Sequence, residues 1–382
     1  MQFQAGPPYS RDMRTRVTDL FGIEFPIFAF SHCRDVVAAV SRAGGMGVLG
    51  ALYFTPEELE IELKWIDDHV DGRPYGVDVV MPASYAGADL DVDSPADLVA
   101  RLQGMIPQAH RDFVENLLSR HGVPPLTGSD PGRVLLGWTD ATARPQVEVA
   151  LRHPIALLAN ALGPPPADVV ELAHAKGVKV AALASTPRHA VKQVEVGVDV
   201  VVAQGTEAGG HTGEISTMVL IPQVVDAVDV PVLAAGGVGT GRQMAAGMAL
   251  GAEGVWTGSV WLTVEEADTS ELVKRRILEA TSRDTVRSRS WTGKPARLLR
   301  NEWTEAWESA ESPGTLPMPL QFMLVSGALR RIGSSGAAEL TTFPAGQIIG
   351  AMNQVKSARQ VVFEMVEEYV ETMERLERVN RD

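Results

Sequence analysis

The sequence is poor in cysteine, with Cys33 alone among 382 residues. A single cysteine cannot form an intramolecular disulfide, and no spacing of cysteine and histidine indicates a zinc site. Long apolar runs are also missing, because the stretch after Arg11, Arg14 and Arg16 is interrupted early by Asp19. We therefore expect no signal peptide, no membrane span, no bound metal, and a location in the cytoplasm.

Positive charge is in short supply, since 34 Lys and Arg stand against 48 Asp and Glu, a formal net charge of −14. Nucleic acids and anionic membranes bind proteins through basic surfaces, so neither is an expected partner. Apolar residues make up 45% and charged residues 21%, which is ordinary for a folded globular protein and argues against disorder. A small molecule is the expected partner.

Short apolar runs recur along the chain with helical segments between them. The runs lack the polar and apolar alternation of a half-exposed strand, which indicates parallel strands buried on both faces. Eight such strands predict an α/β fold of the (β/α)8 TIM-barrel class, with a doubly wound open sheet as the alternative. The strands are expected at 25–30, 47–49, 76–81, 155–160, 178–183, 198–203, 231–235 and 254–257, and helices at 34–43, 56–70, 167–175, 186–196 and 240–250.

Two segments fall outside this repeat. Residues 84–150, rich in glycine, proline and aspartate, are expected to form a surface insertion. Residues 261–340 are rich in tryptophan and are expected to form a helical cap or lid over one mouth of the barrel. A final helix is predicted from about 346 to 379. The barrel domain would then comprise residues 14–260 and 341–382.

The run Gln204-Gly-Thr-Glu-Ala-Gly-Gly-His-Thr-Gly213 follows a buried strand and crowds glycines around one histidine. In parallel barrels, the loops after the carboxyl ends of the strands build the active site. Glycine in such a loop permits positive φ and a close approach of the backbone to a ligand. His211 would stand at the barrel mouth and exchange protons near neutral pH, so we predict that it acts in catalysis.

Two further glycine clusters indicate a phosphate site. Gly236, Gly237 and Gly239 lie between a strand and a helix, and Gly258 and Ser259 follow the next strand. Backbone N–H groups and the helix dipole attract phosphate at such places, and barrels often bind it after their last two strands. A Rossmann dinucleotide site is the weaker interpretation, because the cluster comes late in the chain and lacks an acidic ribose partner.

These motifs resemble the nitronate monooxygenase family, formerly called 2-nitropropane dioxygenases, whose superfamily also contains flavin-dependent enoyl thioester reductases. The resemblance covers about residues 14–260 and rests on 204–213, Leu233-Ala-Ala-Gly-Gly237 and Trp256-Thr-Gly-Ser259. It implies flavin mononucleotide (FMN) at the barrel mouth and makes His211 the catalytic base. The flavin contacts that it implies are Ala29, Phe30, Ser31, Asp78, Gln204, Gly209, Gly210, Gly236, Gly237, Gly258, Ser259 and Gln347.

The sequence departs from the family pattern at two places. Asp78 occupies a third-strand position that is commonly asparagine, and an ionised carboxylate cannot donate a hydrogen bond to a flavin. His32 and Cys33 follow the first strand, where the family often has a Pro-Met pair. Contact with the substrate and a purely structural role are both open for these two residues.

The resemblance implies an FMN-dependent oxidoreductase. Oxidation of a nitronate with O2 is the leading prediction, because no second dinucleotide motif is visible. Reduction of an enoyl thioester or quinone with NAD(P)H is the alternative, and the long insertions favour it because they indicate a substrate larger than a nitroalkane. A flavin-free phosphate-binding barrel isomerase or synthase is the second alternative. A homodimer is expected only by analogy with other barrel enzymes.

Overall fold

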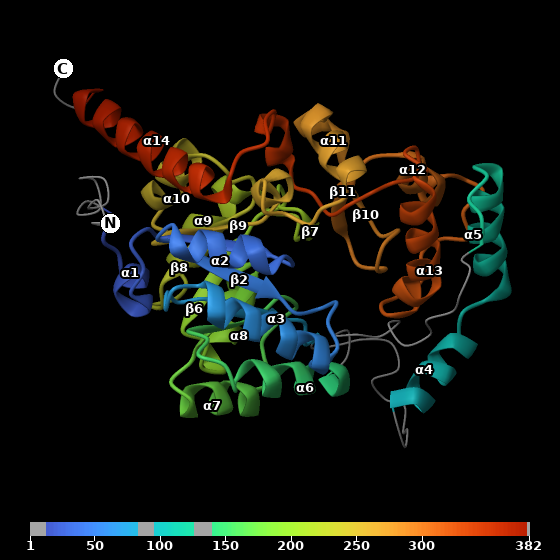
Figure 1. Cartoon of the computed structure of the whole chain (residues 1–382), viewed down its shortest axis with the longest axis horizontal. Helices are drawn as coiled ribbons and strands as arrows, with labels where there is room; N and C mark the ends of the chain where they lie inside the picture. Colours follow the sequence, from blue (N-terminus) through green and yellow to red (C-terminus); the bar gives the residue numbers. More distant parts are fainter. Residues whose placement is uncertain (1–12, 83–94, 126–139, 380–382) are drawn as a thin grey trace.

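The computed structural model describes residues 13–82, 95–125 and 140–379. Eight parallel strands close into a barrel in the order β1-β2-β3-β4-β5-β6-β8-β9, which confirms the predicted (β/α)8 TIM barrel (Figure 1). Their ends lie within two residues of the expected ones. The strands are β1 (Ile27–Ser31), β2 (Met46–Gly50), β3 (Gly76–Val79), β4 (Leu157–Asn160), β5 (Lys179–Ala184), β6 (Val200–Gln204), β8 (Val232–Ala235) and β9 (Gly254–Thr257).

Helices surround the barrel and extend beyond it. Among the described residues, no helix is both long and apolar enough to cross a membrane. The helices are α1 (Arg16–Phe21), α2 (Arg34–Arg42), α3 (Pro56–His69), α4 (Pro95–Gly104), α5 (Gln108–Arg120), α6 (Asp140–Ala150), α7 (Ala167–Ala175), α8 (Pro187–Glu195), α9 (Thr217–Val225), α10 (Gly241–Ala249), α11 (Glu271–Glu279), α12 (Glu302–Glu308), α13 (Leu320–Ser335) and α14 (Ala358–Val379), with the 3-10 helices η3 (Ser259–Thr263), η4 (Ser282–Asp284) and η5 (Gln347–Ala351).

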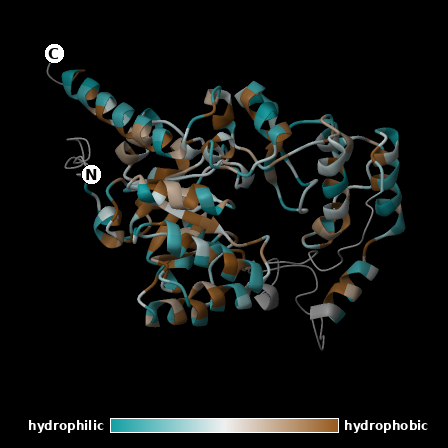
Figure 2. Ribbon diagram, viewed as in Figure 1, coloured by the Kyte–Doolittle hydropathy of each residue, from teal (hydrophilic) through white to brown (hydrophobic). Residues whose placement is uncertain are grey.

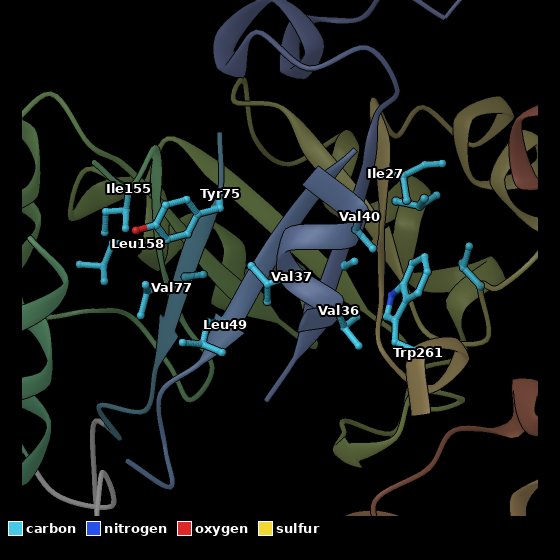
Figure 3. Packing of buried hydrophobic residues seen from close by; sticks show 14 of the residues in the cluster. Ile27, Val36, Val37, Val40, Leu49, Tyr75, Val77, Ile155, Leu158 and Trp261 are labelled. Atoms are coloured by element: carbon cyan, nitrogen blue, oxygen red, sulfur yellow. The ribbon is translucent and has the colours of Figure 1, made fainter. Parts of the chain in front are cut away.

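The barrel strands are apolar on both faces, as Figure 2 shows by their colour. Along β1, Ile27 belongs to the layer between strands and outer helices, whereas its neighbour Phe28 belongs to the cluster inside the barrel. Figure 3 shows the outer layer, in which Val37 and Val40 of α2 lie over the strands. Because both alternating sets are buried, the strand sequences show no period of two.

Local signals set the helix ends. Thr55 caps α3: the hydroxyl accepts the backbone N–H of Glu58 at 3.1 Å, and the Glu58 carboxylate accepts the N–H of Thr55 at 3.0 Å. Such a reciprocal box satisfies two N–H groups that the first turn leaves without helical partners. Thr240 and Gln243 form the equivalent box at the start of α10.

A second group of helices lies beside the barrel, at the right of Figure 1. Apolar side chains of α5 pack against Trp303 and Trp307 of α12 and against α13 in one buried cluster. Arg331 fastens this contact, because its guanidinium donates to Glu115 at 2.7 Å and to the carbonyl of Pro124 at 2.9 Å. The expected insertion and the expected cap therefore touch each other through α5 and α13.

The remainder of the expected insertion divides between the barrel and undescribed chain. Helix α6 packs on α3 of the barrel wall, and the Gln146 amide donates to the carbonyls of Ala51 and Phe54 at 2.9 and 2.8 Å. Residues 84–94 and 126–139 lie outside the described residues. The division of the chain into a barrel domain and a cap domain stays a prediction.

The predicted continuous helix from about 346 to 379 is wrong in its first third. The chain instead forms η5, an irregular stretch, and then α14 from Ala358. Two glycines explain the break, because they bring this stretch against other backbone. A Cβ on Gly346 would lie 2.7 Å from the carbonyl oxygen of Glu207, and one on Gly350 would lie 2.5 Å from the backbone nitrogen of Ser282. Tertiary contact overrides helix propensity here.

Candidate active site

A cavity of about 770 Å³ opens at the carboxyl ends of the strands. Its wall combines the barrel loops with residues of the expected cap, including Trp291, Phe322 and Arg330. The cavity brings together eleven of the thirteen residues expected at the site, namely Phe30, Ser31, Asp78, Gln204, Gly209, Gly210, His211, Gly236, Gly237, Gly258 and Ser259. Ala29 and Gln347 do not line it. Ala29 is fully buried in β1, and the Gln347 N–H donates to the carbonyl of Glu207 at 2.9 Å.

His211 is held by a small antiparallel sheet rather than by the barrel itself. Strand β7 (Gly210–His211) pairs with β11 (Ala296–Leu299), which pairs with β10 (Thr285–Ser288). The imidazole Nε2 lies 2.7 Å from the hydroxyl oxygen of Thr292, which orients the ring. Burial, with a smaller contribution from the nearby Lys294 ammonium, lowers the pKa of His211 to about 4. The imidazole is therefore neutral at pH 7 and can accept a proton.

The glycines around His211 serve close packing within the protein. A Cβ on Gly205 would lie 2.1 Å from the Thr217 hydroxyl oxygen, and one on Gly209 would lie 2.7 Å from the backbone nitrogen of Gly346. Gly210 differs, because it has φ of 73° and no atom within 4 Å of a Cβ position. Glycine was expected here for positive φ or for close approach of the backbone to a ligand. Positive φ applies at Gly210, whereas Gly205 and Gly209 approach other parts of the protein closely.

The loop after β8 carries unused N–H groups. Gly236 and Gly237 have φ of 100° and 70°, and within the described residues neither backbone N–H meets an acceptor. The N–H groups of Gly239 and Thr240 are different, because both donate to the Gln243 side-chain oxygen at 3.0 Å. The first two glycines therefore offer donors to an anion at the cavity, as the sequence predicted for a phosphate, whereas the helix terminus itself is already capped.

Asp78 is a buried carboxyl group. It is 3% exposed, and its Oδ1 has no hydrogen-bond partner among the described residues. Burial raises the pKa of Asp78 to about 8, so the carboxyl is protonated at neutral pH. A protonated carboxyl donates one hydrogen bond and accepts others. The objection that an aspartate cannot donate to a flavin ring therefore does not apply to this residue.

The opposite part of the cavity wall is apolar. Leu52, Val80 and Phe322 belong to one buried cluster that joins the strand ends to α13, and Trp291 packs against it. Tyr53 lines the same cavity as Trp291, and burial raises the pKa of the Tyr53 phenol to about 12. An apolar wall with few polar groups suits the body of an organic ligand.

Two side chains near His211 were not predicted from the sequence. Thr292 lies 81 positions after His211 and Lys294 lies beyond it, and no local pattern relates them. Cys33, by contrast, is buried, with its thiol donating to the carbonyl of Glu266 at 3.2 Å, and does not line the cavity. Among the described residues, no group of three or more His, Cys, Asp or Glu side chains is placed to hold a metal ion.

A parallel barrel with a neutral histidine and unused N–H donors at the carboxyl ends of its strands is typical of barrel enzymes that hold a phosphate-bearing ligand. Residues 14–368 match the family described as nitronate monooxygenase. The chain belongs to this family and is a flavin-dependent oxidoreductase.

Three relatives show how far the similarity extends. A Mycobacterium tuberculosis protein, provisionally named a monooxygenase, is 54% identical over 377 residues, covering 96% of this chain and 99% of its own. The nitroalkane oxidase of Streptomyces ansochromogenes is 28% identical with a TM-score of 0.77, covering 94% of this chain and 99% of its own. FabK of Thermotoga maritima is 29% identical with a TM-score of 0.73, covering 95% and 98%.

Proposed function

We propose that this protein is an FMN-dependent nitronate monooxygenase that oxidises alkyl nitronates with O2. The observation that carries the proposal is the neutral His211, held by Thr292 at the wall of a largely apolar cavity. Family membership and the similarity to a nitroalkane oxidase support the same reaction. Family membership also counts against a flavin-free isomerase or synthase.

The cavity residues fit a flavin phosphate and ring. The N–H groups of Gly236 and Gly237 would hold the phosphate, together with Gly258 and Ser259 of the neighbouring loop. The buried Asp78 carboxyl, whose Oδ1 lacks a protein partner, would meet the polar edge of the ring. When bound, the flavin supplies electron transfer between the substrate and oxygen.

His211 contributes proton chemistry and orientation. A neutral imidazole cannot attract the anionic nitronate by charge, so it acts through one N–H donor and one lone pair. Because Nε2 is engaged by the Thr292 hydroxyl, the proposed contact with the substrate is made by Nδ1. As an N–H it can hold an oxygen of the nitronate, and in the other tautomer its lone pair can take the proton of the corresponding nitroalkane. Thr292 holds the ring through Nε2, so that Nδ1 keeps its direction.

The alternative is an NAD(P)H-dependent flavin reductase that acts on an enoyl thioester or a quinone. Its support is the extent of the cavity, which continues past the barrel loops to Phe322, Leu329 and Arg330 of α13. A nitronate of a short alkane would leave this outer part to water. Both candidates use the same cavity and the same histidine.

One spectroscopic experiment separates the two candidates. The purified protein is kept without oxygen, and its visible spectrum is followed while NADPH and then NADH are added, before a nitronate. For a monooxygenase, we expect a flavin band that stays oxidised with both dinucleotides and changes when the nitronate is added. Prompt bleaching by either dinucleotide would establish the reductase instead, and the absence of any flavin after reconstitution would defeat both. The cytoplasmic location and the homodimer stay predictions.

A further inference from the structure

A second histidine, His32, lines the same cavity as His211. The Nδ1 atom of His32 lies 2.8 Å from the carbonyl oxygen of Gly50, at the end of β2. Around the closed barrel, β2 and β6 are four strands apart in either direction, through β3, β4 and β5 or through β1, β9 and β8. The two imidazoles line one cavity, His32 beside the end of β2 and His211 on β7, which follows β6 and pairs with β11.

The neighbouring side chains fix the position of the His32 ring. The ring packs edge to face on Phe30, with centroids 5.1 Å apart, and against Tyr53 at 4.9 Å. Gly50 leaves the necessary space, because a Cβ there would lie 2.6 Å from both Cε1 and Nδ1 of the imidazole. Any side chain at position 50 would therefore displace His32 from the cavity wall.

The contact with Gly50 also fixes which nitrogen carries the proton. A carbonyl oxygen only accepts hydrogen bonds, so Nδ1 of His32 must be the protonated nitrogen. Burial lowers the pKa of His32 below its ordinary 6.5, which leaves Nε2 as a lone pair at neutral pH. Within the described residues, no group donates to Nε2, and the atom is not sealed inside the protein. It therefore presents an acceptor to whatever occupies the cavity.

We infer that His32 is a specificity-determining substrate contact, with Nε2 accepting a hydrogen bond from an O–H or N–H group of the substrate. The inference rests on the proposed function and names its substrate class: nitronates whose chain carries a hydroxyl or amide donor. A lone pair repels other acceptors, so the nitronate oxygens lie toward His211 and the donor lies toward His32. A purely structural histidine would need only its bond to Gly50, and this difference makes the inference testable.

The test uses matched alkyl nitronates that differ only in whether the chain carries a hydroxyl group. For the natural enzyme, we expect kcat/KM to favour the hydroxylated compound by roughly tenfold, mainly through KM. The His32→Asn variant keeps a donor for the Gly50 carbonyl but lacks Nε2, so the ratio of kcat/KM for the two compounds should fall to about one, whatever the absolute turnover of the variant. Retention of the preference in His32→Asn, or its absence in the natural enzyme, would overturn the inference.

A second measurement needs no variant and no turnover. The histidine nitrogens are labelled with 15N in the flavin-bound protein without oxygen, and each nitronate is added in turn. The 15N chemical shift of the unprotonated Nε2 of His32 should change when the hydroxylated compound is added and should not change when the plain compound is added. An unmoved signal under saturation would contradict the inference, even if His32→Asn does not fold. If the natural enzyme turns over no nitronate, the proposed function fails instead, and the two failures are distinguishable.

Discussion

The imidazole Nε2 of His211 lies 2.7 Å from the hydroxyl oxygen of Thr292, a residue 81 positions further along the chain. His211 belongs to a loop of the barrel, whereas Thr292 belongs to the segment between β10 and β11. The candidate catalytic group is therefore oriented by a part of the chain outside the eight barrel strands. Changes in that segment should reach the chemistry through this contact and through the pairing of β7 with β11.

Removal of the Thr292 hydroxyl should impair turnover without removing the flavin. In Thr292→Val, we expect kcat/KM to fall by about tenfold, because one neutral hydrogen bond that orients the imidazole is lost. Thr292→Ser keeps the hydroxyl and is the matched control, so it should retain most of the activity. Equal activity of the valine variant and the natural enzyme would show that His211 does not depend on this contact.

Loss of His211 should be more severe. We expect His211→Gln to lower kcat/KM by about 10² to 10⁴ while the flavin spectrum is unchanged, since proton transfer contributes on that scale. Because the pKa of His211 is lowered to about 4, its neutral form is present above that value. The histidine contribution to kcat/KM should thus be constant near neutral pH and decline only as pH falls toward 4. A decline centred near 6.5 in the natural enzyme would contradict this pKa.

Two neighbouring glycines should respond differently to substitution. In Gly209→Ala, the new Cβ would lie 2.7 Å from the backbone nitrogen of Gly346, so β7 must shift away from residues 345–347. We expect a lower melting temperature, a loss of about 1–3 kcal/mol in the free energy of unfolding, and a reduced kcat/KM.

Gly210→Asn is the comparison for this steric effect. Asparagine adopts positive φ more readily than other residues, and nothing lies within 4 Å of the Cβ position. Its melting temperature should therefore stay closer to that of the natural protein. If Gly210→Asn is the more damaging of the two, close packing at Gly209 is not what the loop requires.

The sequence predicted the barrel well because each strand is buried on both faces and reads as an uninterrupted apolar run. It also placed His211, because a glycine cluster directly after a strand is a local signal. It missed Thr292, since the contact with His211 depends on how β7 and β11 pair. It likewise missed the packing of α5 on α13, in which Arg331 bonds to Pro124 across 207 positions. Contacts between distant segments leave no period or spacing in the sequence.

The prediction of where the final helix begins was wrong for a related physical reason. Residues 346–357 have no strong helix breaker other than two glycines, so their pattern continues that of α14. In the structure, those glycines allow close contact with Glu207 and Ser282, and such contacts are decided by the tertiary fold. The contact at Gly346 is made with Glu207 and Gly209 of the His211 loop, so this part of the failed prediction and the candidate site share one cause.

Asp78 should make the stability of the flavin-free protein depend on pH. Its pKa rises from 3.8 in a free side chain to about 8 in the fold, so between these values the folded state binds more protons than the unfolded state. Stability is then highest below pH 4 with respect to this group and is lost as pH rises toward 8, by an amount on the order of several kcal/mol. Asp78→Asn removes the titration and keeps the shape.

The measurement compares the two proteins by thermal unfolding without flavin. The difference in melting temperature between natural protein and Asp78→Asn should grow in favour of asparagine as pH increases from 5 to 8. Asp268→Asn controls for the loss of one carboxyl from the cavity wall, because Asp268 is exposed. A difference that is constant across this range would mean that Asp78 is already ionised or paired in the fold, and its role as a donor to the flavin would then be untenable.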